Sequence, residues 1–164
     1  MSVIDRPQRN SAAIHISVLV AALLGVAIPP TWAASPDVSG IWMIEDEVAV
    51  ESYDCGGLLC ARIAWLARPR DAAGQPRRDV KNPDKALRQR TLCGLTVIKG
   101  LRRTGPERWD GGSFYDPRDG QTYHLTMARQ SPDVLTGRVY VLLPIFGKSQ
   151  TMNRVQDVPA AGRC

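Results

Sequence analysis

The chain has 164 residues, of which 44% are hydrophobic and 23% charged, and 21 Lys and Arg against 16 Asp and Glu give a formal net charge of +5. This composition excludes both a disordered chain and one that is embedded in a membrane along its whole length, and the length favours a single domain. The 14 glycines and 12 prolines predict many turns.

The N-terminal segment has the order of a secretory signal peptide. Two arginines precede an uncharged stretch with the compact apolar run 18–28, and small residues stand at the positions that a signal peptidase reads before Ala34. The alternative, a transmembrane anchor, needs about 20 apolar residues, and this run is shorter. We therefore expect a cleaved signal peptide over 1–33 and a periplasmic protein of one domain over 34–164, with no membrane anchor left after cleavage.

Beyond the cleavage site, short runs rich in β-branched and aromatic residues recur between Gly, Pro and Asp, which predicts antiparallel strands. The predicted strands are Ile41–Glu45, Val48–Tyr53, Leu59–Leu66, Leu95–Leu101, Ser113–Tyr115, Thr122–Ala128, Leu135–Val141 and Ser149–Val155. About eight strands favour an all-β, closed barrel, because closure removes exposed sheet edges, and a β-sandwich is the alternative. A barrel of this size holds only side chains or one small ligand.

Four cysteines in an exported chain favour disulfides. Cys55 and Cys60 flank a hairpin loop, where cross-strand Cα atoms lie about 4.5–5.5 Å apart and within reach of a bridge. A redox or metal role is the alternative, but the spacing differs from that of thioredoxin-type sites and only His124 could add an imidazole ligand. Cys93 and Cys164 either form a second bridge or remain free thiols.

The segment between the third and fourth predicted strands is polar, with one short helix predicted to begin at Asn82 as cap and Pro83 in its first turn. From Arg68 to Arg108, twelve basic and four acidic side chains give +8, and the rest of the mature chain sums to −4. This asymmetry suggests an anionic surface or ligand, such as lipid phosphate or envelope polysaccharide, with a solvated charged loop as the alternative. Nucleic acid is not expected, because the segment lacks interleaved aromatic residues and the chain is exported.

Catalytic candidates are few. A hydrolase built on Ser, His and Asp would need His124, which alternates with Tyr123 and Leu125 on a strand and is expected to face solvent. A carboxylate pair for glycosidase-type chemistry could come from Glu45, Asp46, Glu47 and Glu51, which more simply form a solvated hairpin edge. The stretch 116–120 lacks the ligand pattern of a calcium loop and is typical of a turn. We expect no catalytic residue, metal or cofactor.

Arg138 and Tyr140 lie two residues apart on one strand and share a face. If they point inward, they could hold a carboxylate or phosphate by charge-assisted hydrogen bonds. The other face, with Leu135, Gly137 and Val139, is more typical of core, so an outward orientation is the alternative.

Ordered blocks that cover nearly all of the mature chain resemble DUF2147, a family of exported bacterial proteins of unknown function. The blocks are 55–66 with Cys55-Gly56 and Leu59-Cys60-Ala61-Arg62-Ile63-Ala64-Trp65-Leu66, 79–95 with Asp79-Val80-Lys81-Asn82-Pro83-Asp84, 109–123 with Trp109-Asp110-Gly111-Gly112 and Asp116-Pro117-Arg118-Asp119-Gly120, and 147–155. The resemblance implies a lipocalin-like, or calycin-like, β-barrel in the periplasm. It brings no catalytic residue.

The chain departs from the usual pattern of the family at four positions. The family usually has Gly at Ala61 and Trp at Met152, and many members have Cys at Val139 and Phe146. These differences leave the expected fold unchanged and bear on the pocket.

Residues that match the family motif, together with Arg138 and Tyr140, are the candidates for ligand binding. The matching residues are Trp42, Arg62, Trp65, Asp79, Asn82, Arg90, Trp109, Tyr115, Asp116, Tyr123 and Arg154. The structural alternative places Trp42, Trp65 and Tyr123 in the core. It makes Asp79 and Asn82 loop anchors, with Arg62 and Arg90 as their ion-pair partners.

The leading hypothesis is therefore a non-enzymatic periplasmic barrel that binds a small amphipathic or anionic ligand. The alternative is an interaction protein that uses its basic segment on an anionic envelope component. An envelope hydrolase is a third hypothesis. The oligomeric state does not follow from the sequence.

Overall fold

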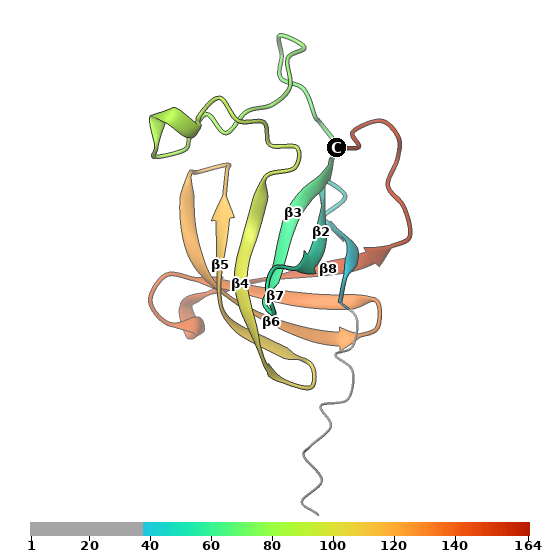
Figure 1. The fold of residues 1–164 in the computed structure, drawn as a ribbon, viewed down its shortest axis with the longest axis vertical. Helices are drawn as coiled ribbons and strands as arrows, with labels where there is room; N and C mark the ends of the chain where they lie inside the picture. Colours follow the sequence, from blue (N-terminus) through green and yellow to red (C-terminus); the bar gives the residue numbers. More distant parts are fainter. Residues whose placement is uncertain (1–37) are drawn as a thin grey trace, which may run out of the picture. The chain divides into compact units, whose positions relative to one another are not determined.

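The structure is a computed structural model that describes residues 38–164, so the predicted signal peptide lies outside the described residues. Eight antiparallel strands form a closed barrel in which each strand pairs with the next and the last pairs with the first (Figure 1). The strands are β1 (Gly40–Ile44), β2 (Val48–Asp54), β3 (Leu59–Leu66), β4 (Thr96–Gly105), β5 (Arg108–Asp116), β6 (Gln121–Ser131), β7 (Val134–Tyr140) and β8 (Lys148–Val155). The predicted barrel is confirmed, and the sandwich alternative was wrong.

Several strands are longer than predicted, and β4, β5 and β6 extend furthest beyond the predicted bounds. β5 runs over Arg108–Asp116 instead of Ser113–Tyr115, because Gly111 takes a positive φ of 70° at a register shift and the pairing resumes beyond it. β4 continues past Leu101 to Gly105. These extensions are polar or rich in glycine and carry no alternating pattern, so the sequence does not reveal them as strands.

The predicted helix that begins at Asn82 was also wrong in extent. Only a short 3₁₀ helix forms, η1 (Lys85–Leu87), and its cap is Asp84, whose carboxylate accepts a hydrogen bond from the backbone N–H of Ala86. Asn82 is instead buried. A second 3₁₀ helix, η2 (Pro144–Phe146), lies between β7 and β8. Within residues 38–164, no helix is long and apolar enough to cross a membrane.

One end of the barrel is closed by a core around Trp42, which is 1% exposed. Its indole N–H lies 3.0 Å from both the carbonyl oxygen of Val38 and the hydroxyl of Ser52. The guanidinium of Arg154 in β8 stacks on the indole at 4.3 Å. Gly40 makes room for this arginine, since a Cβ at that position would lie 2.7 Å from the Arg154 Nη1. Trp42 and Arg154 are paired in register, so this contact lies on the seam that closes the barrel.

The C-terminal tail covers the outer face of β3, and Figure 1 shows it returning to the end of that strand. Trp65 packs there with Ala49 and Val158, and its indole N–H donates a hydrogen bond to the carbonyl of Ala161 at 2.8 Å. Trp65 is therefore buried, as predicted, but in a second cluster outside the barrel.

The predicted Cys55–Cys60 disulfide is present in the β2–β3 hairpin, and Cys93 and Cys164, whose pairing the sequence left open, form a second disulfide between the β3–β4 segment and the tail. No cysteine among the described residues is free. The second bridge fixes the end of the tail beside β3, where the backbone N–H of Cys164 donates to the carbonyl of Ala64.

The two disulfides should contribute unequally to stability. The Cys93–Cys164 bridge spans a sequence separation of 71 and the Cys55–Cys60 bridge one of 5, and the chain-entropy account then assigns about 4 and about 2 kcal/mol to them. Urea unfolding of the two double Cys→Ser variants, without reductant so that the remaining disulfide stays intact, should therefore show the larger loss for Cys93 and Cys164. An equal or larger loss for Cys55 and Cys60 would contradict this.

Candidate functional site

The barrel interior contains a cavity of about 290 Å³ that opens at the end opposite Trp42. Its wall is largely apolar and is built from inward-facing side chains of the strands. These are Val50, Ile63, Val97, Ile98, Phe114, Leu125, Val139 and Met152. Gly137 in β7 contributes space, because a Cβ there would only reach ordinary contact distance from Leu125 and Met152.

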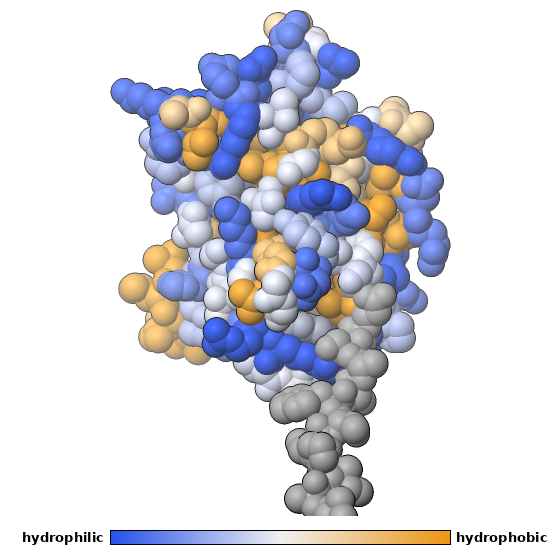
Figure 2. Space-filling model, in the orientation of Figure 1, coloured by the Kyte–Doolittle hydropathy of each residue, from blue (hydrophilic) through white to orange (hydrophobic). Residues whose placement is uncertain are grey.

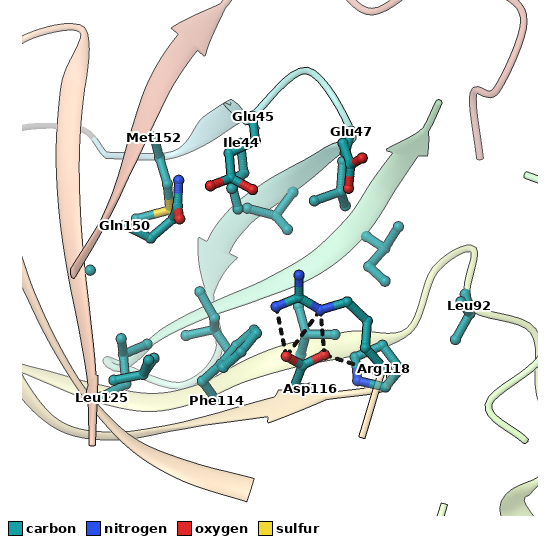
Figure 3. A pocket seen from close by; sticks show the side chains of 18 of the residues that line it. Ile44, Glu45, Glu47, Leu92, Phe114, Asp116, Arg118, Leu125, Gln150 and Met152 are labelled. Carbon is teal, nitrogen blue, oxygen red and sulfur yellow. Dashed lines mark hydrogen bonds and ion pairs between the residues drawn. The ribbon is translucent and has the colours of Figure 1, made fainter. Parts of the chain in front are cut away.

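Charged side chains surround the mouth of the cavity (Figure 3). They are Glu45 and Glu47 at the β1–β2 turn, Arg77 in the β3–β4 segment, Asp116 and Arg118 at the end of β5, and Lys148 at the start of β8. Figure 3 shows the Arg118 guanidinium over the Asp116 carboxylate, across the opening from Glu45 and Glu47. An apolar interior with a charged rim fits a molecule that has one apolar and one polar end.

Most of these charges are already compensated. Arg118 donates to both carboxylate oxygens of Asp116, at 2.7 to 3.1 Å, and Glu47 pairs with Arg68 at 3.3 Å. Glu45 lies in the field of Arg118, where its negative charge helps to raise the Arg118 pKa after the larger effect of the Asp116 hydrogen bond. Within residues 38–164, Arg77 and Lys148 have no side-chain hydrogen bond or ion pair. Of the described charges at the mouth without a side-chain hydrogen bond or ion pair, Arg77 and Lys148 are positive and Glu45 is negative, so their sum is positive.

The β3–β4 segment forms one wall of the mouth and is held there by the buried carboxylate of Asp79, which is 0% exposed. This carboxylate accepts hydrogen bonds from the Tyr115 hydroxyl at 2.6 Å, the Asn82 amide at 2.8 Å and the Arg90 guanidinium at 2.7 and 2.9 Å. Tyr115 belongs to β5, so the cluster ties the segment to the barrel wall beside the opening.

Asp79 is ionised in this cluster. Burial raises the pKa of its carboxyl, but the hydrogen bonds from Tyr115, Asn82 and Arg90, together with the charge of Arg90, outweigh burial and hold that pKa below its ordinary value. The same contact acts in reverse on Tyr115, whose pKa is raised by burial and by the neighbouring carboxylate. A stable carboxylate at this point lets the segment keep one position.

A second contact holds the β3–β4 segment at the mouth. Gly120, in the turn between β5 and β6, has a φ of 77°, and a Cβ there would lie 2.0 Å from the carbonyl oxygen of Lys81. The backbones therefore meet at a distance that only glycine allows. Beside this contact the surface is hollowed over about 420 Å³, and its basic lining consists of Arg77, Arg78, Lys81 and Arg118.

The residues named from the sequence separate into four places. Asp79, Asn82, Arg90 and Tyr115 form the anchor described above, and Asp116 is the one candidate that lines the cavity. Trp42, Trp109 and Arg154 belong to the closed end. The remaining candidates lie on the outer surface or at its edge.

Among these remaining residues, Arg62 pairs with Glu51 at 2.8 Å on the outer face, so its expected pairing with the Asp79 segment was wrong. Tyr123 is half-buried rather than core, because its hydroxyl donates to Asp119 in the adjoining turn. Arg138 donates to the backbone of the β7–β8 loop. Tyr140 stacks on His124, which is exposed as expected.

Sequence reasoning missed the cations that stand free at the mouth. Arg77 was counted within the basic segment and Lys148 within no site at all. Arg77 precedes β4 and Lys148 begins β8, and both lie at the same end of the barrel. That they share this end follows only from the order in which the strands pair. Gly137 gave a usable signal, since a glycine inside a strand often marks space for a close approach.

Comparison with known proteins gives two findings. The family described as "Uncharacterized protein conserved in bacteria (DUF2147)" matches residues 40–154. Among solved structures, protein HP1028 from the human pathogen Helicobacter pylori, described as belonging to the lipocalin family, is similar at 26% identity and a TM-score of 0.64, over 74% of this chain and 84% of that one. No curated protein matches the chain significantly.

The anchor can be tested by removing its charge. Asp79→Asn should lower the free energy of unfolding by about 3 kcal/mol, because Arg90 and Tyr115 lose the carboxylate that compensates them. It should also make the β3–β4 segment sensitive to trypsin. Asp84→Asn removes the same charge from the same segment but keeps an acceptor for the η1 cap, and should cost less than about 0.5 kcal/mol. Equal losses in urea unfolding would show that Asp79 is not the anchor.

Proposed function

The chain belongs to the DUF2147 family, and on that premise we propose that it is a non-enzymatic periplasmic barrel that binds one small amphipathic ligand. The apolar part of the ligand lies in the barrel, and its anionic group lies at the mouth. The observation that carries this proposal is an apolar cavity whose lining includes two cations without a described side-chain partner, Arg77 and Lys148.

The size and lining of the cavity support a small ligand with one chain. Pockets for drug-sized molecules range upward from about 300 Å³, and this cavity of about 290 Å³ stands at the lower end. Each methylene buried in such a wall contributes about 0.8 kcal/mol. A single short acyl or alkyl chain is the apolar group that best fits.

The charges at the mouth support an anionic group on that ligand. Two hydrogen bonds fix the backbone of Arg77. Its N–H donates to the carbonyl of Pro69, and its carbonyl accepts from the N–H of Leu92. Arg77 lines both the cavity and the adjoining basic hollow. A phosphate or carboxylate placed there gains charge-assisted hydrogen bonds without breaking the Asp116–Arg118 pair.

The hydrolase alternative finds less support. His124 lies on the outer face of β6, stacked on Tyr140, and does not line the cavity. Glu45 and Glu47 do reach the mouth, but Glu47 is paired with Arg68. We therefore assign these carboxylates to the rim and not to a reaction.

Alkyl phosphates test the proposal directly. In isothermal titration of the series from hexyl to dodecyl phosphate, affinity should rise about fourfold per added methylene and level off once the chain fills the cavity. Alkyltrimethylammonium ions of equal length should bind at least about tenfold more weakly, because the unpaired charges at the mouth sum to a positive charge.

Three variants locate the binding. Gly137→Leu should block the cavity and abolish binding while circular dichroism shows an intact barrel. Arg77→Gln should weaken alkyl phosphate binding about tenfold, whereas Arg102→Gln, an exposed β4 residue away from the cavity, should leave it unchanged. An affinity that does not depend on chain length would reject the proposal, and so would equal affinity for the alkyltrimethylammonium series.

Export is tested separately, by the intact mass of the protein after expression from its full sequence in a Gram-negative bacterium. We expect a periplasmic species that begins at Ala34 and has all four cysteines oxidised, as suits an oxidising compartment. A full-length mass in the cytoplasmic fraction, with reduced cysteines, would contradict this part of the proposal.

A further inference from the structure

The loop between β7 and β8 exposes an unusual amount of apolar surface. Its residues 141–146, hereafter the apolar loop, hold five large apolar side chains. They are Val141, Leu142, Leu143, Ile145 and Phe146, exposed by 66%, 85%, 54%, 73% and 80%. Figure 2 shows the loop as a hydrophobic projection at the left of the molecule. A contiguous patch of this kind marks an interaction surface.

Part of the backbone of the apolar loop, at residues 143–146, is hydrogen-bonded within the protein. Arg138 donates to the carbonyls of Pro144 and Ile145 and to the hydroxyl of Ser149. The N–H groups of Phe146 and Gly147 donate to the carbonyls of Leu143 and Pro144 in the η2 turn. Backbone groups that leave water for hydrocarbon must be paired internally, so these hydrogen bonds lower the cost of moving the second half of the loop to an apolar surrounding.

The hairpin that carries the apolar loop is purely cationic. The chain has no carboxylate between Asp133 and Asp157, while Arg138, Lys148 and Arg154 lie in that range. Lys148 stands at the base of the loop with no side-chain partner among the described residues. Tyr140, stacked on His124, stands at the other side of the base. Apolar side chains above a base of cationic and aromatic ones match the layers of an anionic bilayer surface.

From these observations we propose that the apolar loop docks the barrel on an anionic lipid bilayer, with its tip among the acyl chains and Lys148 at the phosphates. Lys148, Ser149 and Gln150, directly after the loop, line the mouth of the cavity. Docking therefore brings the mouth to the lipid surface. If the ligand proposed above is correct, on which this last step rests, it enters from the membrane.

A second copy of the chain fits the apolar loop less well. Within residues 38–164, the other exposed large hydrophobic side chains are only Val80 and Leu87. A partner copy thus offers little apolar surface beyond these two side chains and the same projecting loop. The basic hairpins of two copies would also repel each other on contact.

Vesicle co-sedimentation tests the docking, with vesicles of phosphatidylglycerol and phosphatidylethanolamine compared with vesicles of phosphatidylcholine alone. The wild-type protein should bind the anionic vesicles more tightly, and added salt should weaken that binding. The Leu142→Asp/Phe146→Asp variant should lose about tenfold or more in affinity. The control Val80→Asp places the same charge on an exposed apolar site outside the loop and should bind like the wild type. All variants carry the same N-terminus, so any contribution from residues 1–37 cancels.

A tryptophan in place of Phe146 reports the depth of insertion. The emission of Phe146→Trp should shift to the blue with anionic vesicles and be quenched by bromine placed on the acyl chains. Absence of vesicle binding by the wild type, or equal binding by the Leu142→Asp/Phe146→Asp variant, would overturn the proposal. So would a dimer in sedimentation velocity that the same variant abolishes, because the loop would then contact a second copy.

The docking proposal and the ligand proposal can be rejected independently of each other. Leu142→Asp/Phe146→Asp should bind decyl phosphate in solution as the wild type does, since neither side chain lines the cavity. Gly137→Leu, which blocks the cavity, should still sediment with anionic vesicles. Loss of vesicle binding in Gly137→Leu alone would overturn docking by the loop.

Discussion

The charge that Asp79 carries into the protein interior must be compensated, and the groups that compensate it come from separate parts of the chain. Tyr115 belongs to the barrel wall, whereas Asn82 and Arg90 belong to the long segment between β3 and β4. A buried carboxylate without these partners would be costly, so the segment keeps its place beside the opening. Arg77 and Leu92 then form part of the rim instead of a free loop. The Cys93–Cys164 bridge fixes the far end of the same segment to the tail.

The two ends of the barrel thus differ in structure. At the closed end, Trp42 and Arg154 meet across the β1–β8 seam and fill the interior with side chains. At the open end, small or short residues such as Gly137 and Val139 leave space, and the rim is charged. The apolar loop extends that rim outward. The cavity thus lies toward the open end of the barrel, and that end carries cations and hydrophobic side chains. These groups suit the anionic amphiphile and the lipid surface proposed above.

Local patterns were sufficient to predict the strands whose side chains alternate, such as β3 and β6, and the short cysteine spacing predicted the first disulfide. The first half of β5 was not predicted, because Asp110, Gly111 and Gly112 are typical of a turn. They pair in the sheet only with the help of a bulge. Asp79, Asn82 and Arg90 were identified as an anchor from the sequence. Their contact with Tyr115 was not, because Tyr115 lies in β5, far along the chain from this segment. The cavity, its free cations and the exposure of the apolar loop depend on which loops share one end of the barrel. Hydropathy alone would place Leu142 and Phe146 in a core.

The central claim is that the cavity holds the chain of an anionic amphiphile whose head group lies at the mouth. A crystal structure of the complex with decyl phosphate brominated at the end of its chain tests this most directly, because anomalous scattering locates the bromine. We expect the bromine inside the barrel beside Leu125 and Gly137, with the phosphate between Arg77 and Lys148. Bromine found only on the outer surface, with the barrel interior unoccupied, would contradict the account.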